Sequence, residues 1–262
     1  MIDIIIPTYN RENLIRRTLS SLVAQTDKKF NVIIVDDAST DNTQLVVKEF
    51  ECFLNIIYLK NEVNIGPGCS RQVGIDNSIS KFVTFLDSDD MFMPYTVEAF
   101  NTAIKANPST EMLCTFFYEH CNKDGDMNMI LWKDNFTAMH GKLYNVEALR
   151  KYNIRFAPDL YFSEDAYFNA ICTELLEVTV LKIPTLIWVY NENSMLHCID
   201  PIRDKNKIST FIKAITMSSD FVKQYKSEVT HLENTLKKIL QNADLSAADR
   251  VVINKLLEGG QN

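Results

Sequence analysis

The sequence of 262 residues lacks the features that mark several special classes of protein. No apolar run approaches about 20 residues, the length that spans a bilayer. The N-terminal stretch MIDIIIPTYN has neither the basic segment nor the cleavage site of a signal peptide. The six cysteines form no Cys-x-x-Cys pair and show no zinc-ligand spacing, so we expect reduced thiols. These absences predict a cytoplasmic protein without a transmembrane segment, which meets a membrane, if at all, only at its surface.

Glycine-rich phosphate loops are missing as well. The first apolar run ends in Pro-Thr-Tyr-Asn, no Gly-x-Gly-x-x-Gly follows it, and residues 7–17 contain no glycine. Backbone amides of glycine loops are what cradle a pyrophosphate in dinucleotide-binding enzymes. The sequence therefore argues against an NAD-type enzyme, and it leaves a nucleotidyltransferase as a weak alternative.

The composition is that of an ordinary globular protein, with 46% hydrophobic and 23% charged residues. Short β-branched runs alternate with amphipathic stretches through the first ninety residues. Because strands covered on both faces are continuously apolar, this alternation predicts an α/β fold with a mostly parallel sheet flanked by helices. We expect strands at 2–6, 31–35, 55–59 and 81–86, with a helix over 68–78.

The second part of the chain is less regular. The pattern predicts a helix over 95–106, a pair of strands at 112–118 and 127–132 joined by a polar turn, and a helix from Glu164 through Cys172. Residues 177–190 are interpreted as two strands broken at Pro184, because proline cannot donate to a strand ladder.

The C-terminal residues 201–262 form a region of their own. Apolar residues follow alternating steps of three and four between Ile208 and Ile239, which is a heptad seam and predicts a helical tail packed on the body. A homodimer formed through this tail is a second hypothesis. Residues 201–241 hold eight basic and four acidic residues, a charge of +4. Since the net charge of the whole chain is −7, the remaining residues carry −11. A basic tail on an acidic body suggests an anionic partner, although such a tail is more often a solvated helix face.

Carboxylates gather where the predicted parallel strands end. Asp36 and Asp37 follow the second strand, and Asp87-Ser88-Asp89-Asp90 follows the fourth. The carboxyl ends of parallel strands share one edge of a sheet, and ligands bind there. Five carboxylates at one edge repel one another, so we expect a divalent cation, Mn²⁺ or Mg²⁺. Such an ion usually completes its ligand shell with phosphate oxygens, which points to a nucleotide or another diphosphate.

Six segments together resemble a known family. They are IIIPTYNRENLIRRTLSSLVAQT, VIIVDDASTDNT, NIGPGCSRQVGI, FVTFLDSDD, GKLYNVEALRKYNIRF and FSEDAYFN, which span residues 2 to about 170. A lone Asp-x-Asp is a weak signal, but these motifs at these intervals resemble the family 2 glycosyltransferases. The resemblance implies a GT-A (Rossmann-like) fold and inverting transfer of a sugar from a nucleotide donor.

The resemblance also implies where the donor nucleotide binds. It assigns the nucleotide to Pro7, Thr8, Tyr9, Asn10, Asp36, Arg71 and Asp87. The ring of Tyr9 is expected near the base, and Asp36 is expected to accept the imide N–H of uracil, which favours a UDP-sugar. Arg71 is expected near the base or a phosphate. Alternatively, Tyr9 is an ordinary half-buried aromatic residue and Arg71 a solvated helix residue.

The remaining site residues follow from the same resemblance. Asp87 and Asp89 are expected to hold the cation, and His197 is a candidate third ligand. Asp165 is the expected general base, while Glu164 orients it or the acceptor, or only starts the helix. His140 is expected on the acceptor side of the cleft. We interpret Asp90 as an acid that complements the dipole of a following helix.

These roles suggest how the chain is divided and what it acts on. Residues 1–95 would bind the nucleotide sugar, 96–200 the acceptor, and 201–262 would form the helical extension. A cell-envelope or capsule saccharide is the first choice of acceptor. The basic tail keeps a polyanionic acceptor as an alternative, either teichoic acid or hydroxymethylated DNA, and binding to it should weaken with salt. A non-catalytic nucleotide-binding module is a further alternative, which the presence of both Asp89 and Asp165 disfavours.

Overall fold

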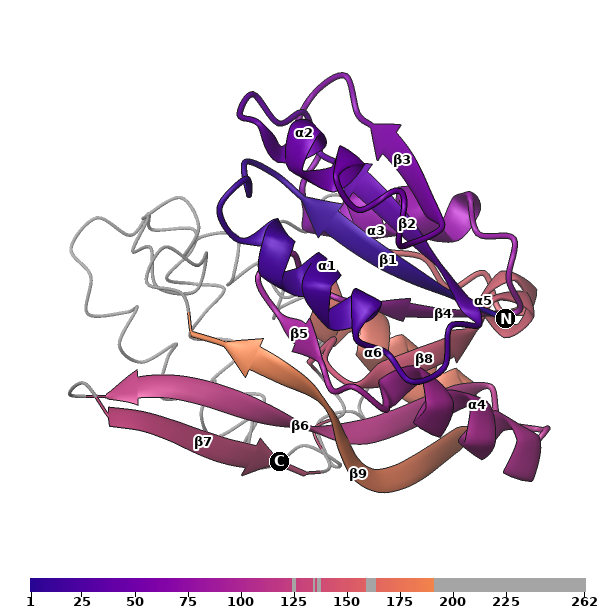
Figure 1. Ribbon diagram of the computed structural model, residues 1–262. Coiled ribbons are helices and arrows are strands. Elements are labelled where there is room, and N and C mark those ends of the chain that lie inside the picture. Colours follow the sequence, from indigo (N-terminus) through magenta and orange to yellow (C-terminus); the bar gives the residue numbers. More distant parts are fainter. Residues whose placement is uncertain (124–125, 134, 136–137, 159–163, 191–262) are drawn as a thin grey trace, which may run out of the picture. The chain divides into compact units, whose positions relative to one another are not determined.

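The computed structural model describes residues 1–123, 126–133, 135, 138–158 and 164–190. In this part of the chain, strands and helices alternate around a single mixed sheet (Figure 1). The strands are β1 (Ile2–Thr8), β2 (Phe30–Asp36), β3 (Ile56–Lys60), β4 (Phe82–Phe85), β5 (Met91–Phe92), β6 (Met112–Lys123), β7 (Asp126–Trp132), β8 (Lys142–Asn145) and β9 (Val178–Val189). The helices are α1 (Ile15–Val23), α2 (Thr43–Lys48), α3 (Pro67–Asp76), α4 (Thr96–Ala106), α5 (Val146–Lys151) and α6 (Glu164–Leu175).

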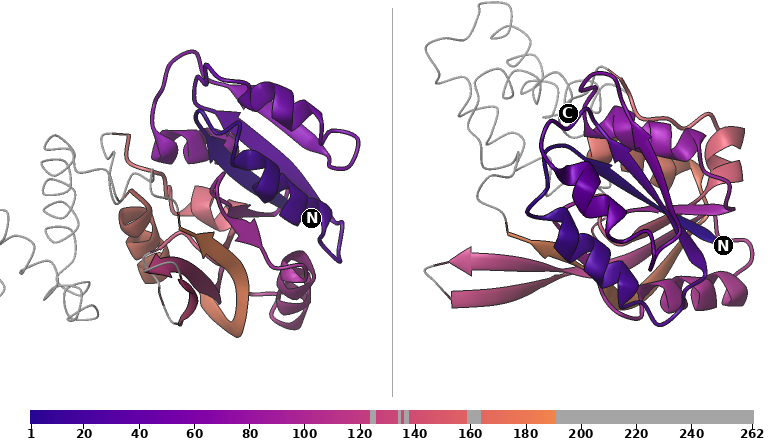
Figure 2. Two further views of the ribbon diagram at one scale, coloured as in Figure 1. Left: turned by 60° about the vertical axis from the view of Figure 1, so that its left-hand side comes forward. Right: turned by 45° about the horizontal axis from the view of Figure 1, so that its top comes forward.

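The N-terminal half of the sheet is parallel, as the sequence predicts. Its strands lie in the order β3-β2-β1-β4 and all three neighbouring pairs are parallel. Successive side chains of β1 alternate between the two faces, because a strand has a period of two. Ile4 and Ile6 join the core on the side of α1, α2 and α4, whereas Ile5 joins the core on the side of α3, α5 and α6. Both faces are therefore covered, and Figure 2 shows these layers from two further directions.

Helix α3 approaches the sheet very closely. A Cβ atom at Gly74 would lie 2.4 Å from Cγ2 of Ile5, a distance that real side chains do not tolerate. Glycine at this position therefore lets α3 lie directly against β1. The close approach matters for the site because α3 also carries Arg71.

The other half of the sheet is mixed. Strand β8 runs antiparallel to both β4 and β6, β9 runs parallel to β6, and β5 closes the sheet antiparallel to β9. The predicted pairing of 112–118 with 127–132 is confirmed, but the hairpin is longer. Its ladder extends from Phe117 and Trp132 to Lys123 and Asp126, so most of the predicted polar turn is strand. Figure 1 shows β6 and β7 running side by side beyond the helices.

Strand β9 corrects one prediction. Residues 178–189 form one continuous strand rather than two strands broken at Pro184. The register along β6 steps from Thr115 opposite Leu181 to Phe116 opposite Pro184, so β9 carries two extra residues at this point. Pro184 itself stands opposite Phe116, and the register shifts again directly after it, so the ladder with β6 is irregular on both sides of the residue that lacks an N–H.

The predicted helices at 68–78, 95–106 and from Glu164 onward are confirmed within a few residues as α3, α4 and α6. In the described part of the chain, no helix combines the length and the apolarity needed to cross a bilayer. The predicted helical tail, the boundary at residues 200 and 201 and His197 lie outside the described residues.

Candidate active site

The three polar strand ends lie at one edge of the sheet, as predicted. Thr8 pairs with Asp36 across β1 and β2, and Ile5 pairs with Phe85 across β1 and β4. Because these strands are parallel, the segments that follow them leave the sheet on the same side. The segments 7–10, 36–37 and 87–90 are therefore neighbours at this edge.

The turn after β1 presents Tyr9 at the surface. Asn10 has a φ of +52°, a left-handed conformation that asparagine adopts more readily than most residues. Its N–H donates to Ser39 Oγ at 2.9 Å, and its side-chain oxygen accepts from the N–H of Thr40 at 2.8 Å. Tyr9 is 44% exposed, whereas Thr8 is buried and its Oγ1 has no hydrogen-bond partner among the described residues.

The two aspartates at the end of β2, Asp36 and Asp37, are held by the protein itself. Asp36 is fully buried, and its carboxylate accepts hydrogen bonds from the N–H of Ser39 at 2.7 Å and from the hydroxyl of Tyr58. Asp37 accepts from the side chain of Asn61 at 2.8 Å, from the N–H of Ile65 at 2.9 Å and from the N–H of Gly66 at 2.8 Å. Asp37 thus fixes the loop that leads into α3. A contact between Asp36 and a base stays a prediction. The N–H of the base would share this carboxylate with the donors of Ser39 and Tyr58.

Arg71 is buried rather than solvated, so its interpretation as a surface helix residue is wrong. It is 5% exposed, with Nη2 at 2.7 Å from Oδ1 of Asp87 and Nη1 at 2.8 Å from Oε1 of Glu164. Burial alone would lower the pKa of the guanidinium, but the two carboxylates raise it. Arg71 therefore joins the end of β4 to the start of α6, two segments that are far apart in sequence.

The first turn of α6 carries the predicted acid pair. Glu164 is buried, and burial together with the neighbouring Asp165 raises its pKa to about 7, although Arg71 opposes the shift. Asp165 is partly exposed and its Oδ1 accepts the N–H of Ala166 at 2.8 Å. Of the two carboxylates, Asp165 is the one more accessible to a substrate, and Glu164 is the one tied to Arg71.

Asp90 is not a helix-dipole residue, which corrects the interpretation from sequence. Helix α4 begins only at Thr96, and Asp90 is fully buried. Its Oδ1 accepts the N–H of Val189 at 2.9 Å, and its Oδ2 lies 3.2 Å from Nε2 of His140. Burial raises the pKa of Asp90 to about 6 despite His140. Burial would lower the pKa of His140, but Asp90 and its acidic neighbours raise it.

His140 is packed between aromatic rings. The ring of Phe117 is 5.0 Å from it and that of Trp188 is 5.3 Å away, measured between centroids. Its side chain is 13% exposed. The predicted placement of His140 on the acceptor side stays a prediction, whereas its contact with Asp90 puts it at the same sheet edge as the Asp87–Asp90 turn.

A candidate metal centre emerges from these contacts. Among the described residues, Asp87, Asp90 and His140 offer ligand atoms that all lie within 4.8 Å of one another. Two adjacent ligands of one octahedral ion, each bonded at about 2.1 Å, stand about 3 Å apart. The 3.2 Å between Asp90 Oδ2 and His140 Nε2 is close to that spacing. Two carboxylates and an imidazole therefore fit Mn²⁺.

This set differs from the one expected from sequence. Asp87 is common to both, Asp90 and His140 are new, and His197 lies outside the described residues. The backbone carbonyl of Asp89 accepts a hydrogen bond from Arg17, and a metal contact of the Asp89 carboxylate stays a prediction. A further residue that sequence reasoning missed is Lys142, which is 1% exposed. Its position between Gly141 and Leu143 in an apolar strand was the available signal.

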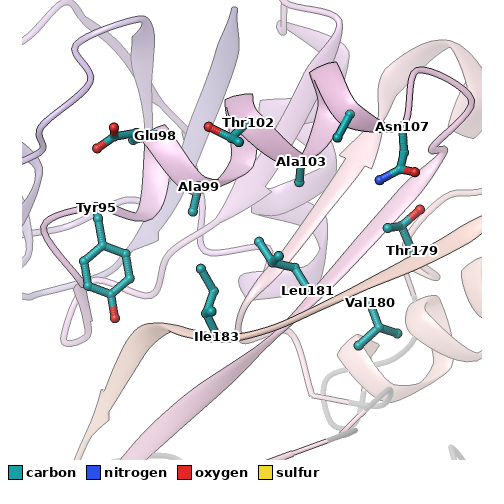
Figure 3. Close-up of a pocket in the computed structure, with 11 residues that line it drawn as sticks. Tyr95, Glu98, Ala99, Thr102, Ala103, Asn107, Thr179, Val180, Leu181 and Ile183 are labelled. Atoms are coloured by element: carbon teal, nitrogen blue, oxygen red, sulfur yellow. The ribbon is translucent and has the colours of Figure 1, made fainter.

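A separate cavity lies away from this edge. Its volume is about 440 Å³, and it lies between α4 and β9, where Figure 3 shows Tyr95, Ala99 and Ile183 among the lining side chains. No residue that the sequence predicts for the site lines it. The carboxylate edge and this cavity are therefore different features of the molecule.

Curated proteins that the chain resembles are glycosyltransferases. An uncharacterized glycosyltransferase of Haemophilus influenzae is 39% identical over 113 residues, 43% of this chain and 37% of that protein. The poly(ribitol-phosphate) beta-N-acetylglucosaminyltransferase TarS of Staphylococcus aureus is 30% identical over 181 residues, 64% of this chain and 31% of that protein. A poly(ribitol-phosphate) beta-glucosyltransferase of Bacillus spizizenii is 30% identical over 183 residues, 64% of this chain and 28% of that protein. The chain thus spans well under half the length of these relatives.

Solved structures share the fold. Residues 1–349 of Staphylococcus aureus TarS in complex with UDP-GlcNAc match with a TM-score of 0.68 at 22% identity, over 99% of this chain and 72% of that one. A Pyrobaculum calidifontis mannosyltransferase in complex with GDP-Man and Mn²⁺ matches with a TM-score of 0.56 at 16% identity, over 98% of this chain and 68% of that one. These likenesses confirm the GT-A fold.

The family itself is shown by the sequence match that covers more than half of the chain. Residues 3–157 match the model of Glycosyl transferase family 2. This range begins in β1 and includes the polar strand ends, the Asp87–Asp90 turn, His140 and Lys142. The chain therefore belongs to glycosyl transferase family 2.

Proposed function

We propose that this protein transfers a sugar from a nucleotide donor to an acceptor hydroxyl, with inversion at the anomeric carbon and with Mn²⁺ or Mg²⁺ bound at the edge of the sheet. The observation that carries the proposal is the arrangement around Arg71. This one buried guanidinium contacts Asp87, in the candidate metal centre, and Glu164, the neighbour of Asp165. Arg71 therefore holds Asp87, which is proposed to bind the donor and the cation, close to the helix start that carries Asp165.

The donor is proposed to be a UDP-sugar. TarS, which shares the fold, has been solved with UDP and with UDP-GlcNAc. In this chain, the exposed ring of Tyr9 offers a surface for a base, and the carboxylate of Asp36 lies at the neighbouring strand end. Pro7 and Thr8 end β1 directly before Tyr9, and Asn10 holds the turn after it. The mannosyltransferase solved with GDP-Man has the same fold, so the uracil preference rests on Asp36 and not on the fold.

The cation is proposed to bind Asp87, Asp90 and His140, with Asp89 and His197 as further ligands expected from the family resemblance. When bound, it neutralises the charge that develops on the departing diphosphate. The mannosyltransferase with the same fold has been solved with Mn²⁺. The carboxylate of Asp87 also pairs with Arg71, so one of its oxygens is left for the ion or for a water on it.

Asp165 is proposed as the general base. It accepts the proton of the acceptor hydroxyl as that oxygen attacks the anomeric carbon, and inversion requires only this one carboxylate. Its neighbour Glu164 is held by Arg71 at 2.8 Å, which fixes the first turn of α6. Asp165 is therefore presented from a helix end that Arg71 anchors.

The acceptor is proposed to be a poly(alditol phosphate) of the teichoic acid type. Two relatives at 30% identity are named as transferases that act on poly(ribitol-phosphate). The basic balance of residues 201–241 suits such a polyanion. A neutral envelope or capsule saccharide is the second candidate. We propose that the reaction takes place in the cytoplasm at the membrane surface. We also propose that two copies of the chain pair through residues 208–239.

The test is a transfer assay on the purified chain. UDP-[¹⁴C]GlcNAc and UDP-[¹⁴C]glucose are each incubated with poly(ribitol phosphate) or with a neutral oligosaccharide, in Mn²⁺ or in EDTA. We expect labelled polymer in Mn²⁺, less of it at high salt, and none from Asp165→Asn, which should still bind UDP. Transfer only to the neutral acceptor would overturn the acceptor assignment. If neither donor loses its labelled sugar in Mn²⁺, the enzyme assignment is contradicted.

A further inference from the structure

Lys142, the first residue of β8, is a lysine with almost no access to solvent. It is 1% exposed, and lysines are almost never fully buried unless they are paired. Its ammonium donates to three backbone carbonyls, those of Asn135 at 2.9 Å, Ala138, and His140 at 3.4 Å. All three belong to the short segment that precedes β8. A single side chain therefore gathers three carbonyl groups of this segment around its ammonium.

The same segment is tied to α6 through one shared atom. The carbonyl oxygen of Ala138 accepts a second hydrogen bond from Nδ2 of Asn169 at 3.0 Å. Asn169 lies four residues after Asp165, on the same face of α6. Oδ1 of Asn169 in turn accepts from the hydroxyl of Tyr144 at 2.5 Å. Ala138 thus joins Lys142 to the helix that carries the proposed base.

Gly141 fixes the chain directly after His140. It has a φ of +65°, and a Cβ atom there would lie 2.6 Å from Oγ1 of Thr115. The N–H of Thr115 donates to the carbonyl of Gly141 at 2.8 Å, which pins this residue to β6. The backbone around His140 is therefore held at two points. Gly141 is hydrogen-bonded to Thr115 of β6, and Lys142 donates to the carbonyls of Asn135, Ala138 and His140.

The consequence is the position of the imidazole. With its backbone held in this way, the His140 ring lies between Phe117 and Trp188, and Nε2 is 3.2 Å from Asp90. A buried, charged donor that meets three carbonyls makes stronger hydrogen bonds than a neutral one. Three carbonyl acceptors around one nitrogen suit the ammonium form, since a neutral amine has only two N–H donors.

We propose that Lys142 is a positioning residue, whose ammonium holds the carbonyl groups of Asn135, Ala138 and His140 so that His140 stays beside Asp90 and Asp87 as a metal ligand. This inference rests on the proposed function, because it takes the cation site as given. Lys142 itself touches neither the ion nor the substrate. Groups that orient a metal ligand in this way typically change metal affinity by about 10- to 100-fold when they are removed.

The experiment measures Mn²⁺ binding without turnover, by electron paramagnetic resonance of free Mn²⁺, on folded variants of the whole chain. Lys142→Met keeps the length of the side chain but removes all three donors. We expect its Mn²⁺ affinity to fall by about tenfold or more. Leu143→Ala is the matched control, because Leu143 is buried in the next position of the same strand and its side chain has no donor for the three carbonyls. The control should bind Mn²⁺ as the wild type does.

A double-mutant cycle separates positioning from a general loss of stability. If Lys142 acts through His140, then Lys142→Met should weaken Mn²⁺ binding little further in a His140→Gln background. Full additivity of the two changes would overturn the proposal, and so would a folded Lys142→Met with unchanged affinity. Lys142→Gln, which retains two donors, serves where the methionine variant does not fold, and it should show an intermediate loss of affinity.

Nuclear magnetic resonance of the histidine rings tests the inference apart from metal binding. The His140 signal, assigned by its absence in His140→Gln, should shift in Lys142→Met and stay in place in Leu143→Ala, in metal-free protein. A wild type that binds no Mn²⁺ would contradict the proposed cation site, while a shifted ring would still support the role of Lys142. An unmoved ring would overturn that role whatever the metal does.

Discussion

The guanidinium of Arg71 lies 2.7 Å from the carboxylate of Asp87, so a buried cation from α3 rests against the acid that follows β4. The side chain of Asp87 is 34% exposed, whereas that of Arg71 is 6% exposed. The pair therefore lies at the boundary between the core and the sheet edge. Its second carboxylate partner, Glu164, brings the start of α6 to the same point.

Replacing Arg71 should lower the free energy of unfolding. Arg71→Gln leaves Glu164 without its buried counter-charge, and breaking such a buried pair costs about 3–5 kcal/mol. Arg71→Lys keeps the charge but cannot bridge two carboxylates with a planar fork, so we expect an intermediate loss. Urea denaturation gives the free energies of unfolding. The matched control is Arg155→Gln, because the Arg155–Asp76 pair is exposed at 54% and 46% and should contribute about 1 kcal/mol or less. Equal losses for Arg71→Gln and Arg155→Gln would contradict this account.

Glu164 should make stability depend on pH. Burial raises its pKa to about 7 in the folded state, whereas its ordinary value is 4.5. The folded state therefore binds a proton more tightly than the unfolded state, and stability is lost as the pH rises from about 4.5 to 7. Glu164→Gln removes this titration, so the wild type should lose melting temperature relative to the variant across that window. Melting curves between pH 4.5 and 8 measure the difference, and a constant offset at every pH would show that Glu164 does not titrate in this range.

Asp3 should stabilise the opposite end of the sheet. Its buried carboxylate accepts hydrogen bonds from the hydroxyls of Ser78 and Ser80, the N–H groups of Ile79 and Ser80, and the side chain of Asn31. Burial would raise the pKa of Asp3, but these donors together lower it. Asp3→Asn turns an amide N–H₂ towards groups that donate, and we expect a loss of about 2–4 kcal/mol at pH 7.

The loss at Asp3 should also shrink in acid. Because the pKa of Asp3 is depressed in the folded state, its contribution is fully present above its ordinary pKa of 3.8 and disappears as the pH falls below it. Urea denaturation at pH 7 and at pH 3 measures both effects. Asp3 lies at the start of β1, at the far end from the proposed site, so the variant should bind UDP as the wild type does. A loss that grows in acid would show that the hydrogen bonds of the ionised carboxylate are not its cause.

Asp90 should contribute to cation binding. Asp90→Asn keeps an oxygen for the N–H of Val189 but removes the negative charge beside His140. We expect Mn²⁺ affinity to fall by about tenfold or more. Isothermal titration with Mn²⁺ measures this, and Asp89→Asn titrated in parallel tests the ligand predicted from the family resemblance. Wild-type affinity in Asp90→Asn together with a strong loss in Asp89→Asn would move the ion away from Asp90 and His140.

The sequence predicts most of the sheet because its strands are buried on both faces. The continuous β-branched runs at residues 2–6 and 31–35 lie within β1 and β2, respectively. The predictions fail where pairing overrides local preference. Residues 119–123 look like a polar turn but continue β6, because β7 supplies a full ladder of partners. Pro184 looks like a strand break, yet β6 accommodates it with a shift in register.

The site divides in the same way. Asp87 and Asp165 are recognisable from the motifs around them, and the structure places both beside the buried ion pairs of Arg71. The contacts of Asp90, which was interpreted as a helix-dipole acid, and those of Lys142 could not be predicted, because their partners are distant in sequence or are backbone atoms. His140 is fifty residues from Asp90, and the carbonyl groups that Lys142 contacts leave no trace in the identity of the residues that bear them. Local pattern predicts a ligand site at a strand end, but it does not reveal the buried groups around that site.

The central claim is that this sheet edge binds a nucleoside diphosphate together with a divalent cation. Isothermal titration of the wild-type chain with UDP, first in Mn²⁺ and then in EDTA, tests it most directly, with UMP as the comparison that lacks the second phosphate. The account predicts that UDP binds in Mn²⁺, that EDTA abolishes or strongly weakens binding, and that UMP binds more weakly than UDP. Equal binding of UDP in Mn²⁺ and in EDTA would contradict the role given to the cation, and no binding of UDP in either condition would contradict the donor assignment.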